Sequence, residues 1–124
     1  MKILIVDDHM IIRRGLVQIL DEFEGQYHSE QAADGVEAMQ KLRASRFDAM
    51  LLDVALGERD GFDVLKSVRS EFPKLGVVML SVYPEAQFAL RAIRSGANAY
   101  LNKGCSPVEL SQAIQMACAG QVYL

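Results

Sequence analysis

The stretch Ala49-Met50-Leu51-Leu52-Asp53 is a short, continuously apolar run that ends in a carboxylate. A run of this length, without the alternation of a half-exposed strand, is typical of a strand buried on both faces of a parallel sheet. An acidic side chain at the end of such a strand is costly to bury unless it is paired or bound to a metal. The stretch therefore predicts a central strand with a functional carboxylate at its carboxyl end.

Other short apolar runs occur along the chain, and segments with helical spacing separate them. The expected strands are Ile3–Val6, Tyr27–Ala33, Ala49–Leu52, Val77–Leu80 and Ala99–Leu101. The second of these is the most polar, so we expect it at an edge of the sheet. Strict alternation of strand and helix predicts an α/β fold: a single doubly wound (βα)5 domain with a parallel sheet and helices on both faces.

Start and stop signals for helices lie between the expected strands. The start signals are Asp34 with Glu37, Asp60-Gly61, Pro84 and the capping box Ser106-Pro107-Val108-Glu109. Pro73 stops the third helix, and Gly96 ends the fourth. The residues expected on the apolar faces are Ile12, Leu16, Ile19, Leu20, Phe23, Ala38, Met39, Leu42, Phe62, Leu65, Val68, Phe72, Ala86, Leu90, Ile93, Leu110, Ala113, Ile114, Ala117 and Cys118.

The composition fits one compact domain. With 124 residues, 51% of them hydrophobic, the chain can bury a core but has no room for a second domain. Its formal net charge of −3 argues against this segment binding a nucleic-acid backbone by itself. Cys105 and Cys118 have no metal-ligand spacing, and a buried free thiol at Cys118 fits a reducing, cytoplasmic setting. The first apolar run reaches Asp7 too soon for a signal peptide, and no run is long enough to span a membrane.

Polar side chains follow four of the five expected strands, namely Asp7-Asp8, Asp53, Ser81 and Asn102-Lys103. Taken singly, each has a simpler explanation, since Asp7 or Asp8 could cap the first helix, Ser81 could serve a turn, and Lys103 could be a solvated charge. Ligand sites in open α/β sheets gather at the carboxyl ends of the strands, which favours one shared site. Three carboxylates suit Mg²⁺, and beside Mg²⁺ a carboxylate can attack phosphorus to give an aspartyl phosphate.

Taken together, these residues resemble the signature set of response-regulator receiver domains of two-component systems. The set comprises Asp7, Asp8, Asp53, Ser81, Tyr100 and Lys103, and the resemblance extends over the whole chain. It implies a flavodoxin-like domain over residues 1–124 with the strand order 2-1-3-4-5. It also implies a signalling domain that is not an enzyme and promotes only its own phosphorylation and dephosphorylation.

The resemblance assigns a role to each position. Asp53 is implied to be the phosphoacceptor and a Mg²⁺ ligand, Asp8 a direct Mg²⁺ ligand, and Asp7 a carboxylate that reaches the metal through water. Ala55 is implied to offer its backbone carbonyl to the metal, and Lys103 to contact the phosphoryl group. Ser81 and Tyr100 are implied to form the switch pair: the hydroxyl moves toward the phosphate and the ring turns inward behind it.

Further stretches are similar to those of NarL/LuxR-type regulators, namely Asp8-His9, residues 81–85, residues 96–101 and residues 120–124. This resemblance implies transcription regulation through a C-terminal helix-turn-helix DNA-binding domain that is absent from this chain, which is then either a fragment or a stand-alone receiver. The implied partners are a sensor histidine kinase and a second copy in a phosphorylation-dependent homodimer, with DNA contacted only through the missing domain and no membrane.

Two positions depart from the family pattern. Gly104 follows Lys103 where proline with a cis peptide bond is common, so this peptide bond is either trans or a strained cis bond. Gly57 occupies another frequent proline position, four residues after Asp53. Neither departure removes a chemical group.

Two other functional classes compete with this interpretation. A Mg²⁺-dependent phosphohydrolase could use Asp53 as its nucleophile, but such enzymes commonly need a further acid two residues on, where this chain has Ala55. An interaction module with a relic site is the second alternative, and the complete set of acids with Ser81 and Lys103 weighs against it.

Overall fold

The computed structural model describes residues 1–56, 59–82 and 86–123. Its main sheet is parallel and has the order β2-β1-β3-β6-β7. These strands are β1 (Lys2–Val6), β2 (His28–Ala32), β3 (Ala49–Asp53), β6 (Gly76–Ser81) and β7 (Ala99–Asn102). The helices are α1 (Met10–Asp21), α2 (Gly35–Ala44), α3 (Gly61–Glu71), α4 (Ala86–Arg94) and α5 (Pro107–Cys118).

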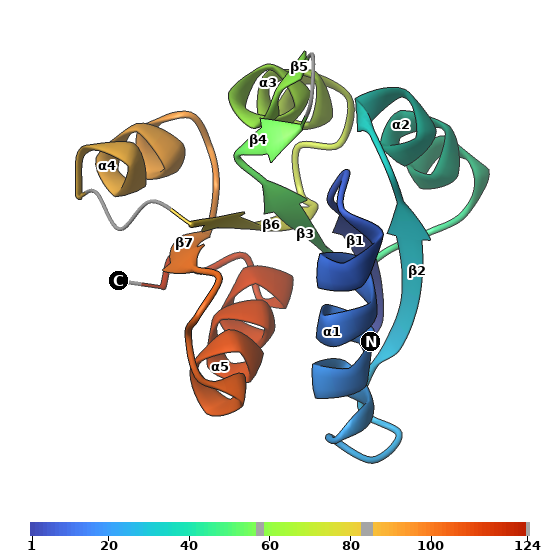
Figure 1. Ribbon diagram of the computed structural model, residues 1–124. Coiled ribbons are helices and arrows are strands. Elements are labelled where there is room, and N and C mark those ends of the chain that lie inside the picture. The colour runs from blue at the N-terminus through green and yellow to red at the C-terminus, as the bar shows by residue number, and fades with distance from the viewer. Residues whose placement is uncertain (57–58, 83–85, 124) are drawn as a thin grey trace.

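Helices cover both faces of the sheet, as the doubly wound prediction requires (Figure 1). The side chains of α2, α3 and α4 pack into one hydrophobic cluster, and those of α1 and α5 pack into another. Strand β1 contributes side chains to both clusters: Leu4 and Val6 belong to the cluster on the side of α2, α3 and α4, and Ile3 and Ile5 belong to the cluster on the side of α1 and α5. This is why the central strands are apolar throughout instead of alternating with polar residues.

The sheet has the predicted strand order 2-1-3-4-5 when its own strands are counted, and the polar strand β2 lies at an edge as expected. The chain-wide numbering differs because two short strands, β4 (Ala55–Leu56) and β5 (Arg59–Asp60), intervene after β3. They form a separate antiparallel pair that the sequence analysis did not predict. Gly57, one of the two departures from the family pattern, lies outside the described residues.

The predicted helix caps are confirmed at three helices. The Asp34 carboxylate accepts a hydrogen bond from the Glu37 backbone N–H at 2.8 Å at the start of α2. Asp60 accepts from the N–H of Phe62 at the start of α3, and Ser106 accepts from the N–H of Glu109 at the start of α5. Pro84, the expected start of the fourth helix, lies outside the described residues.

Two predictions of burial need correction. Leu90 was expected on the buried face of α4, but its side chain is 52% exposed. The buried residue is Ala92, and the partly buried Phe88 packs against the same cluster one helical turn earlier. Cys118 was expected to be a buried thiol and is only partly buried. Among the helices in the described ranges, none is long and apolar enough to cross a membrane.

Candidate functional site

The polar strand-end residues predicted from sequence gather at the carboxyl edge of the sheet. Asp7 follows β1, Asp53 ends β3, and Ser81 ends β6; these residues are 2%, 4% and 1% exposed, in that order. The parallel register pairs Ser81 with Asn102, so Lys103 comes directly after β7 at the same edge. The ends of four neighbouring strands therefore place these polar residues along the same edge of the sheet, as the sequence predicts.

Lys103 joins two of the buried carboxylates. Its Nζ lies 2.8 Å from Asp7 Oδ2 and 3.1 Å from Asp53 Oδ1, and the lysine side chain is only 13% exposed. Burial alone would lower the pKa of Lys103, but the hydrogen bond that its ammonium donates to Asp7 and the charge of Asp53 outweigh it and raise the pKa. Lys103 is therefore held as an ammonium ion between the two acids and is not a solvated surface charge.

The surroundings of Asp53 disfavour the ionised form of its carboxyl group. Burial is the largest cause that raises its pKa, and the nearby charge of Asp7 raises it further. Lys103 and the N–H of Ala55, which donates to Asp53 Oδ1 at 3.2 Å, oppose this rise without cancelling it. A cation beside these carboxylates would relieve the repulsion between them.

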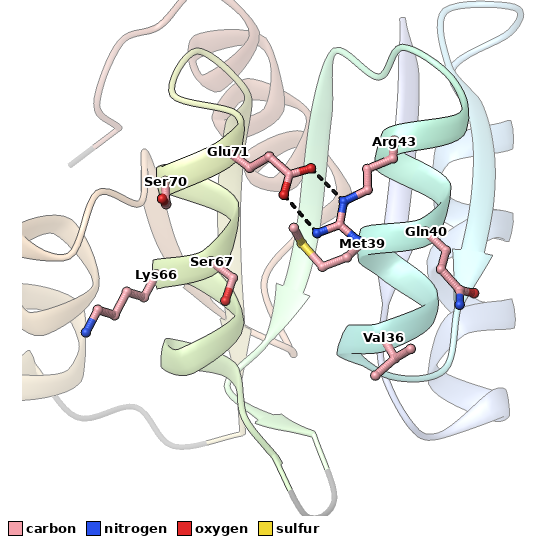
Figure 2. Close-up of a pocket in the computed structure, with 8 residues that line it drawn as sticks. All are labelled: Val36, Met39, Gln40, Arg43, Lys66, Ser67, Ser70 and Glu71. Carbon is pink, nitrogen blue, oxygen red and sulfur yellow. Dashed lines mark hydrogen bonds and ion pairs between the residues drawn. The ribbon is translucent and has the colours of Figure 1, made fainter.

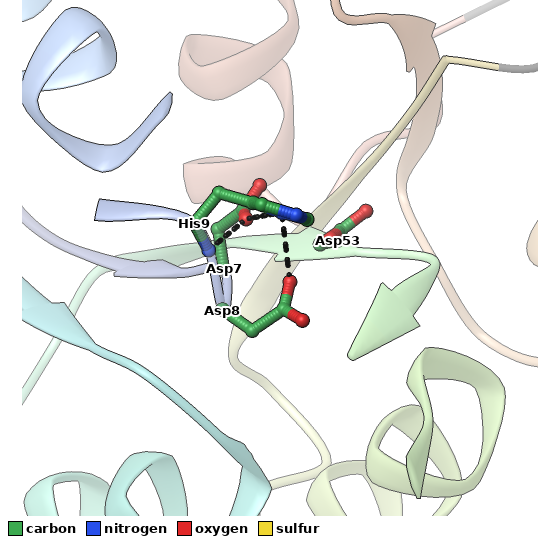
Figure 3. Close-up of side chains that lie close together, drawn as sticks. All are labelled: Asp7, Asp8, His9 and Asp53. Carbon is green, nitrogen blue, oxygen red and sulfur yellow. Dashed lines mark hydrogen bonds and ion pairs between the residues drawn. The ribbon is translucent and has the colours of Figure 1, made fainter. Parts of the chain in front are cut away.

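The carboxylates and one imidazole form a compact group with the donor types of a metal site. Ligand atoms of Asp7, Asp8, His9 and Asp53 all lie within 4.8 Å of one another (Figure 3). His9 follows Asp8 in the sequence, but no role was predicted for it, so this member of the group was missed. Its only signal in the sequence is its position next to Asp8.

The simpler explanation of Asp7 and Asp8, that one of them caps the first helix, is wrong. The residue at the N-cap position of α1 is His9, and no side chain accepts the cap hydrogen bond there. Instead, Asp7 Oδ1 accepts the backbone N–H of His9 at 2.8 Å. The guanidinium of Arg13 donates to the backbone carbonyl of Asp7 and to Gln31 Oε1, so α1 and β2 hold this loop in place.

Helix α3 begins directly behind the end of β3. The N–H of Gly61 donates to the carbonyl of Val54 at 2.7 Å. A Cβ atom at Gly61 would overlap the backbone carbonyl oxygen of Asp53 and lie 2.8 Å from that of Val54. Glycine is thus required for α3 to pack this closely behind Asp53.

The two expected switch residues lie on neighbouring strands. Ser81 is buried at the end of β6, and its backbone carbonyl accepts the N–H of Lys103 at 2.8 Å. Tyr100 is partly buried on β7 and packs against the hydrophobic cluster to which α2, α3 and α4 contribute. Tyr100 also lines a groove of about 410 Å³ together with Ala89, Ile93, Leu101, Glu109 and Tyr123.

The loop after Lys103 settles one question that the sequence left open. No peptide bond in the described part of the chain is cis, so the Lys103–Gly104 bond is trans. The N–H of Gly104 donates to the side-chain oxygen of Asn102 at 2.7 Å, which closes this turn.

A larger groove lies between α2 and α3, away from the acidic group (Figure 2). It measures about 590 Å³ and is crossed by a two-point ion pair, in which Arg43 Nε and NH2 lie 2.6 and 2.8 Å from the two oxygens of Glu71. The bond to Glu71 raises the pKa of Arg43, and the same bond lowers the pKa of Glu71. The pair links two helices at the surface and has no part in the carboxylate group.

Comparison with known proteins gives consistent matches over the chain. The family described as "Response regulator receiver domain" matches residues 3–115. The response regulator GacA of Pseudomonas syringae pv. syringae (strain B728a) is 33% identical over 99% of this chain and 58% of its own length. The response regulator UvrY of Escherichia coli O157:H7 is 30% identical over 98% of this chain and 56% of its own. The chain thus spans little more than half of these curated relatives.

Solved structures agree with this result. The crystal structure of a LuxR-family two-component response regulator from Aurantimonas sp. SI85-9A1 matches with a TM-score of 0.90 at 31% identity, over 99% of this chain and 88% of that one. The receiver domain of the putative response regulator NarL from Mycobacterium tuberculosis matches with a TM-score of 0.85 at 29% identity, over 97% of each chain.

Proposed function

The chain belongs to the response regulator receiver domain family, and on that premise we propose that Asp53 accepts a phosphoryl group from a sensor histidine kinase, with Mg²⁺ bound beside it. The observation that carries this assignment is the position of Lys103, whose ammonium lies between the buried carboxylates of Asp7 and Asp53. A fixed cation within hydrogen-bond distance of a buried carboxylate suits the charge that accumulates on a transferred phosphoryl group.

The donor set fits a hard divalent cation. Asp7, Asp8 and Asp53 supply carboxylate oxygens within 4.8 Å of one another, and the repulsion that raises the pKa of Asp53 is the kind that a cation relieves. Asp8 would bind the metal directly, Asp7 through water, and Ala55 through its backbone carbonyl. Mg²⁺ held there would neutralise negative charge on the carboxylates and on the incoming phosphoryl group.

In the transfer, a carboxylate oxygen of Asp53 forms a bond to phosphorus while the bond from phosphorus to the donor breaks. Asp53 is the carboxylate that ends the central strand, and it can act as the nucleophile toward phosphorus in its ionised form. Lys103 lies within 3.1 Å of Asp53 Oδ1 and is placed to contact the oxygens of the arriving group. Turnover of other substrates is not part of the proposal, since Ala55 stands where phosphohydrolases commonly carry their second acid.

The signal is then read out through Ser81 and Tyr100. In this proposal the Ser81 hydroxyl moves toward the bound phosphoryl group and contacts it. The ring of Tyr100 then turns inward into the space that the hydroxyl has left. Tyr100 already lines the groove between α4, β7 and α5, so its rotation would change the surface that those elements share. A change of that surface on phosphorylation is our basis for proposing a homodimer as the active form.

We place a helix-turn-helix DNA-binding domain after this chain in the full-length protein, which would then regulate transcription. Support comes from the curated relatives, of which this chain spans little more than half. The segment before residue 124 is fixed to the domain, because Asn98 donates to the carbonyl of Gln121 and accepts the N–H of Tyr123. A cytoplasmic location belongs to the same proposal and fits the two free cysteines.

The test is intact-mass measurement after incubation with Mg²⁺ and phosphoramidate. The wild type should gain one phosphoryl group that is stable to acid and labile to base, and Asp53→Asn should gain none. Asp63→Asn is the matched control, because Asp63 is an exposed acid on α3 outside the carboxylate group. Phosphorylation of Asp53→Asn at the wild-type rate would refute the assignment.

The switch is tested separately by sedimentation with beryllofluoride and Mg²⁺. The wild type should self-associate when the phosphate mimic is added. Ser81→Ala should still bind the mimic but associate weakly, because the metal ligands and Lys103 remain while the coupling hydroxyl is lost. Full association of Ser81→Ala would show that Ser81 does not couple the site to the surface.

A further inference from the structure

The chain changes direction where α5 ends and returns to the edge of the sheet. Gly120 has a φ of +75°, in the left-handed region that favours glycine. Its N–H donates to the carbonyl of Ala117 at 3.0 Å, and the N–H of Gln121 donates to the carbonyl of Met116 at 2.9 Å. These two hydrogen bonds form a Schellman turn, which ends the helix. Residues 121–123 then lie beside the start of β7 (Figure 1).

Asn98 fastens these residues to the sheet. It comes directly before β7 and is 9% exposed. Its backbone carbonyl accepts the N–H of Tyr123 at 2.8 Å, and its Nδ2 donates to the carbonyl of Gln121 at 3.0 Å. Strand β7 lies at the edge of the sheet, and an edge strand has backbone groups that no neighbouring strand pairs. Residues 121–123 thus bond where the sheet has room for a further segment.

The oxygen of the same side chain holds Asn98 to the body of the domain. Oδ1 accepts the N–H of Val77 at 3.0 Å and the guanidinium NH2 of Arg69 at 3.1 Å. The two halves of the side-chain amide therefore have different partners, because the oxygen is bound to β6 and α3 while the nitrogen is bound to Gln121. A change that removes only the nitrogen donor would release the segment and keep the anchor of Asn98.

Tyr123 brings the fastened segment to the groove that Tyr100 lines. This groove of about 410 Å³ lies between α4, β7 and α5, and both tyrosines line it. The two partly buried rings approach it from opposite faces of the sheet. Tyr100 packs against the cluster on the side of α2, α3 and α4, and Tyr123 packs against the cluster on the side of α1 and α5. Withdrawal of the Tyr100 ring would therefore remove part of the wall of the groove that holds Tyr123.

We propose that the edge of β7 and this groove form a docking surface for residues 121–123, and that an inward turn of Tyr100 loosens the docked segment. The occupant is a segment of the same chain, already bonded to this edge at Asn98. Phosphorylation of Asp53 then has an output in the C-terminal segment as well as in self-association. The inference rests on the Ser81–Tyr100 switch of the proposed function.

Hydrogen exchange of the Tyr123 amide, followed by NMR, measures the docking, because this N–H donates to Asn98. Asn98→Asp keeps the oxygens that anchor residue 98 to β6 and α3 but lacks the donor to Gln121. Its Tyr123 amide should therefore exchange at least about tenfold faster than that of the wild type. The amide of Leu51, in the buried strand β3, should exchange as in the wild type, since it reports opening of the whole domain.

Val122→Ala is the matched control for the segment. Val122 is a 42% exposed neighbour of Tyr123, and it does not line the groove. After correction for the intrinsic exchange rate, the Tyr123 amide of this variant should stay within about threefold of the wild type. Equal protection of the Tyr123 amide in Asn98→Asp and in the wild type would overturn the docking at Asn98.

Two perturbations test the coupling to Tyr100. Beryllofluoride with Mg²⁺ should speed exchange of the Tyr123 amide at least about fivefold in the wild type and change it little in Asn98→Asp, where the segment is already released. Tyr100→Ala removes the ring from the groove and should speed the same exchange without any phosphate mimic, while the Leu51 amide again reports the whole domain.

The two perturbations separate failure of the coupling from failure of the proposed function. Wild-type protection of the Tyr123 amide, both in Tyr100→Ala and with the mimic bound, would overturn the coupling. Absence of any Mg²⁺-dependent rise in melting temperature with beryllofluoride would show that the mimic does not bind, which would overturn the proposed function. In that case the exchange rate in Tyr100→Ala still decides whether Tyr100 controls the segment.

Discussion

Replacing Gly61 by alanine tests how tightly α3 is packed behind Asp53. The added Cβ would overlap the carbonyl oxygen of Asp53 and lie 2.8 Å from the carbonyl oxygen and 2.9 Å from the Cα of Val54. Carbon atoms in ordinary contact stay about 3.5 Å or more from such neighbours. All of the atoms in the way are backbone, so no side chain can rotate to make room. Either α3 or the end of β3 must move.

The cost follows from this overlap. Over-packing of a core costs about 1–3 kcal/mol, and backbone obstacles put Gly61→Ala near the upper end of that range. For a domain of this size the melting temperature falls by about 4 °C per kcal/mol, so we expect a drop of about 10 °C. Phosphorylation should also slow, because the displaced atoms include the backbone of Asp53.

Gly15→Ala is the control with the opposite sign. Gly15 lies within α1, and a Cβ there would meet nothing within 4 Å. Alanine in place of glycine inside a helix stabilises by about 0.5–1 kcal/mol, so this variant should melt about 2–4 °C above the wild type. Thermal unfolding followed by circular dichroism measures both variants. If Gly61→Ala melts within 2 °C of the wild type, the close packing of α3 against Asp53 is not needed for stability.

Three further perturbations address the acids and the opposite end of the sheet. Asp53→Asn should melt at a higher temperature than the wild type at pH 7 without metal, because burial and the charge of Asp7 raise the pKa of Asp53 in the folded protein. Melts at decreasing pH should show this difference in melting temperature vanishing below the pKa of an unfolded aspartate, where Asp53 is protonated in both the folded and the unfolded protein. Asn98→Ala should lose about 2–3 kcal/mol of unfolding free energy in urea titrations, since the buried N–H of Val77 loses its acceptor. Asp8→Ala should lose most of the Mg²⁺-induced rise in melting temperature, and an unchanged rise would show that Asp8 is not a ligand.

The fold was predictable because short, continuously apolar runs alternate along the chain with segments whose apolar residues have helical spacing. Continuous apolar runs such as Ile3–Val6 can be covered on both faces only in a parallel sheet with helices on each side. Connections between parallel strands then bring all carboxyl ends to one edge. For that reason the sequence alone predicts that Asp7, Asp53, Ser81 and Lys103 lie at the same edge of the sheet.

The errors arise where burial, strand pairing or side-chain direction depends on three-dimensional packing and not on the local sequence pattern. Leu90 looked like a core residue by its type, but α4 is a short helix that buries the small side chain of Ala92. The β4–β5 pair was missed because each of its strands is only two residues long, too short for a sequence pattern to indicate. His9 was missed because its place in the acidic group depends on the direction of its ring, and sequence spacing does not fix that direction.

The position of β7 explains why a change at Asp53 would be transmitted toward Tyr100. Lys103 contacts Asp53, follows β7 directly, and is hydrogen-bonded through its backbone to Ser81. Strand β7 is an edge strand with one neighbour, whereas β3 is paired on both sides and buried along its whole length. On the proposed switch, a displacement of Lys103 would therefore move β7 at lower cost than it would move β3. Because side chains alternate along a strand, Tyr100 and Asn102 share one face of β7, and a twist at its end would reorient the tyrosine that lines the groove beside α4 and α5.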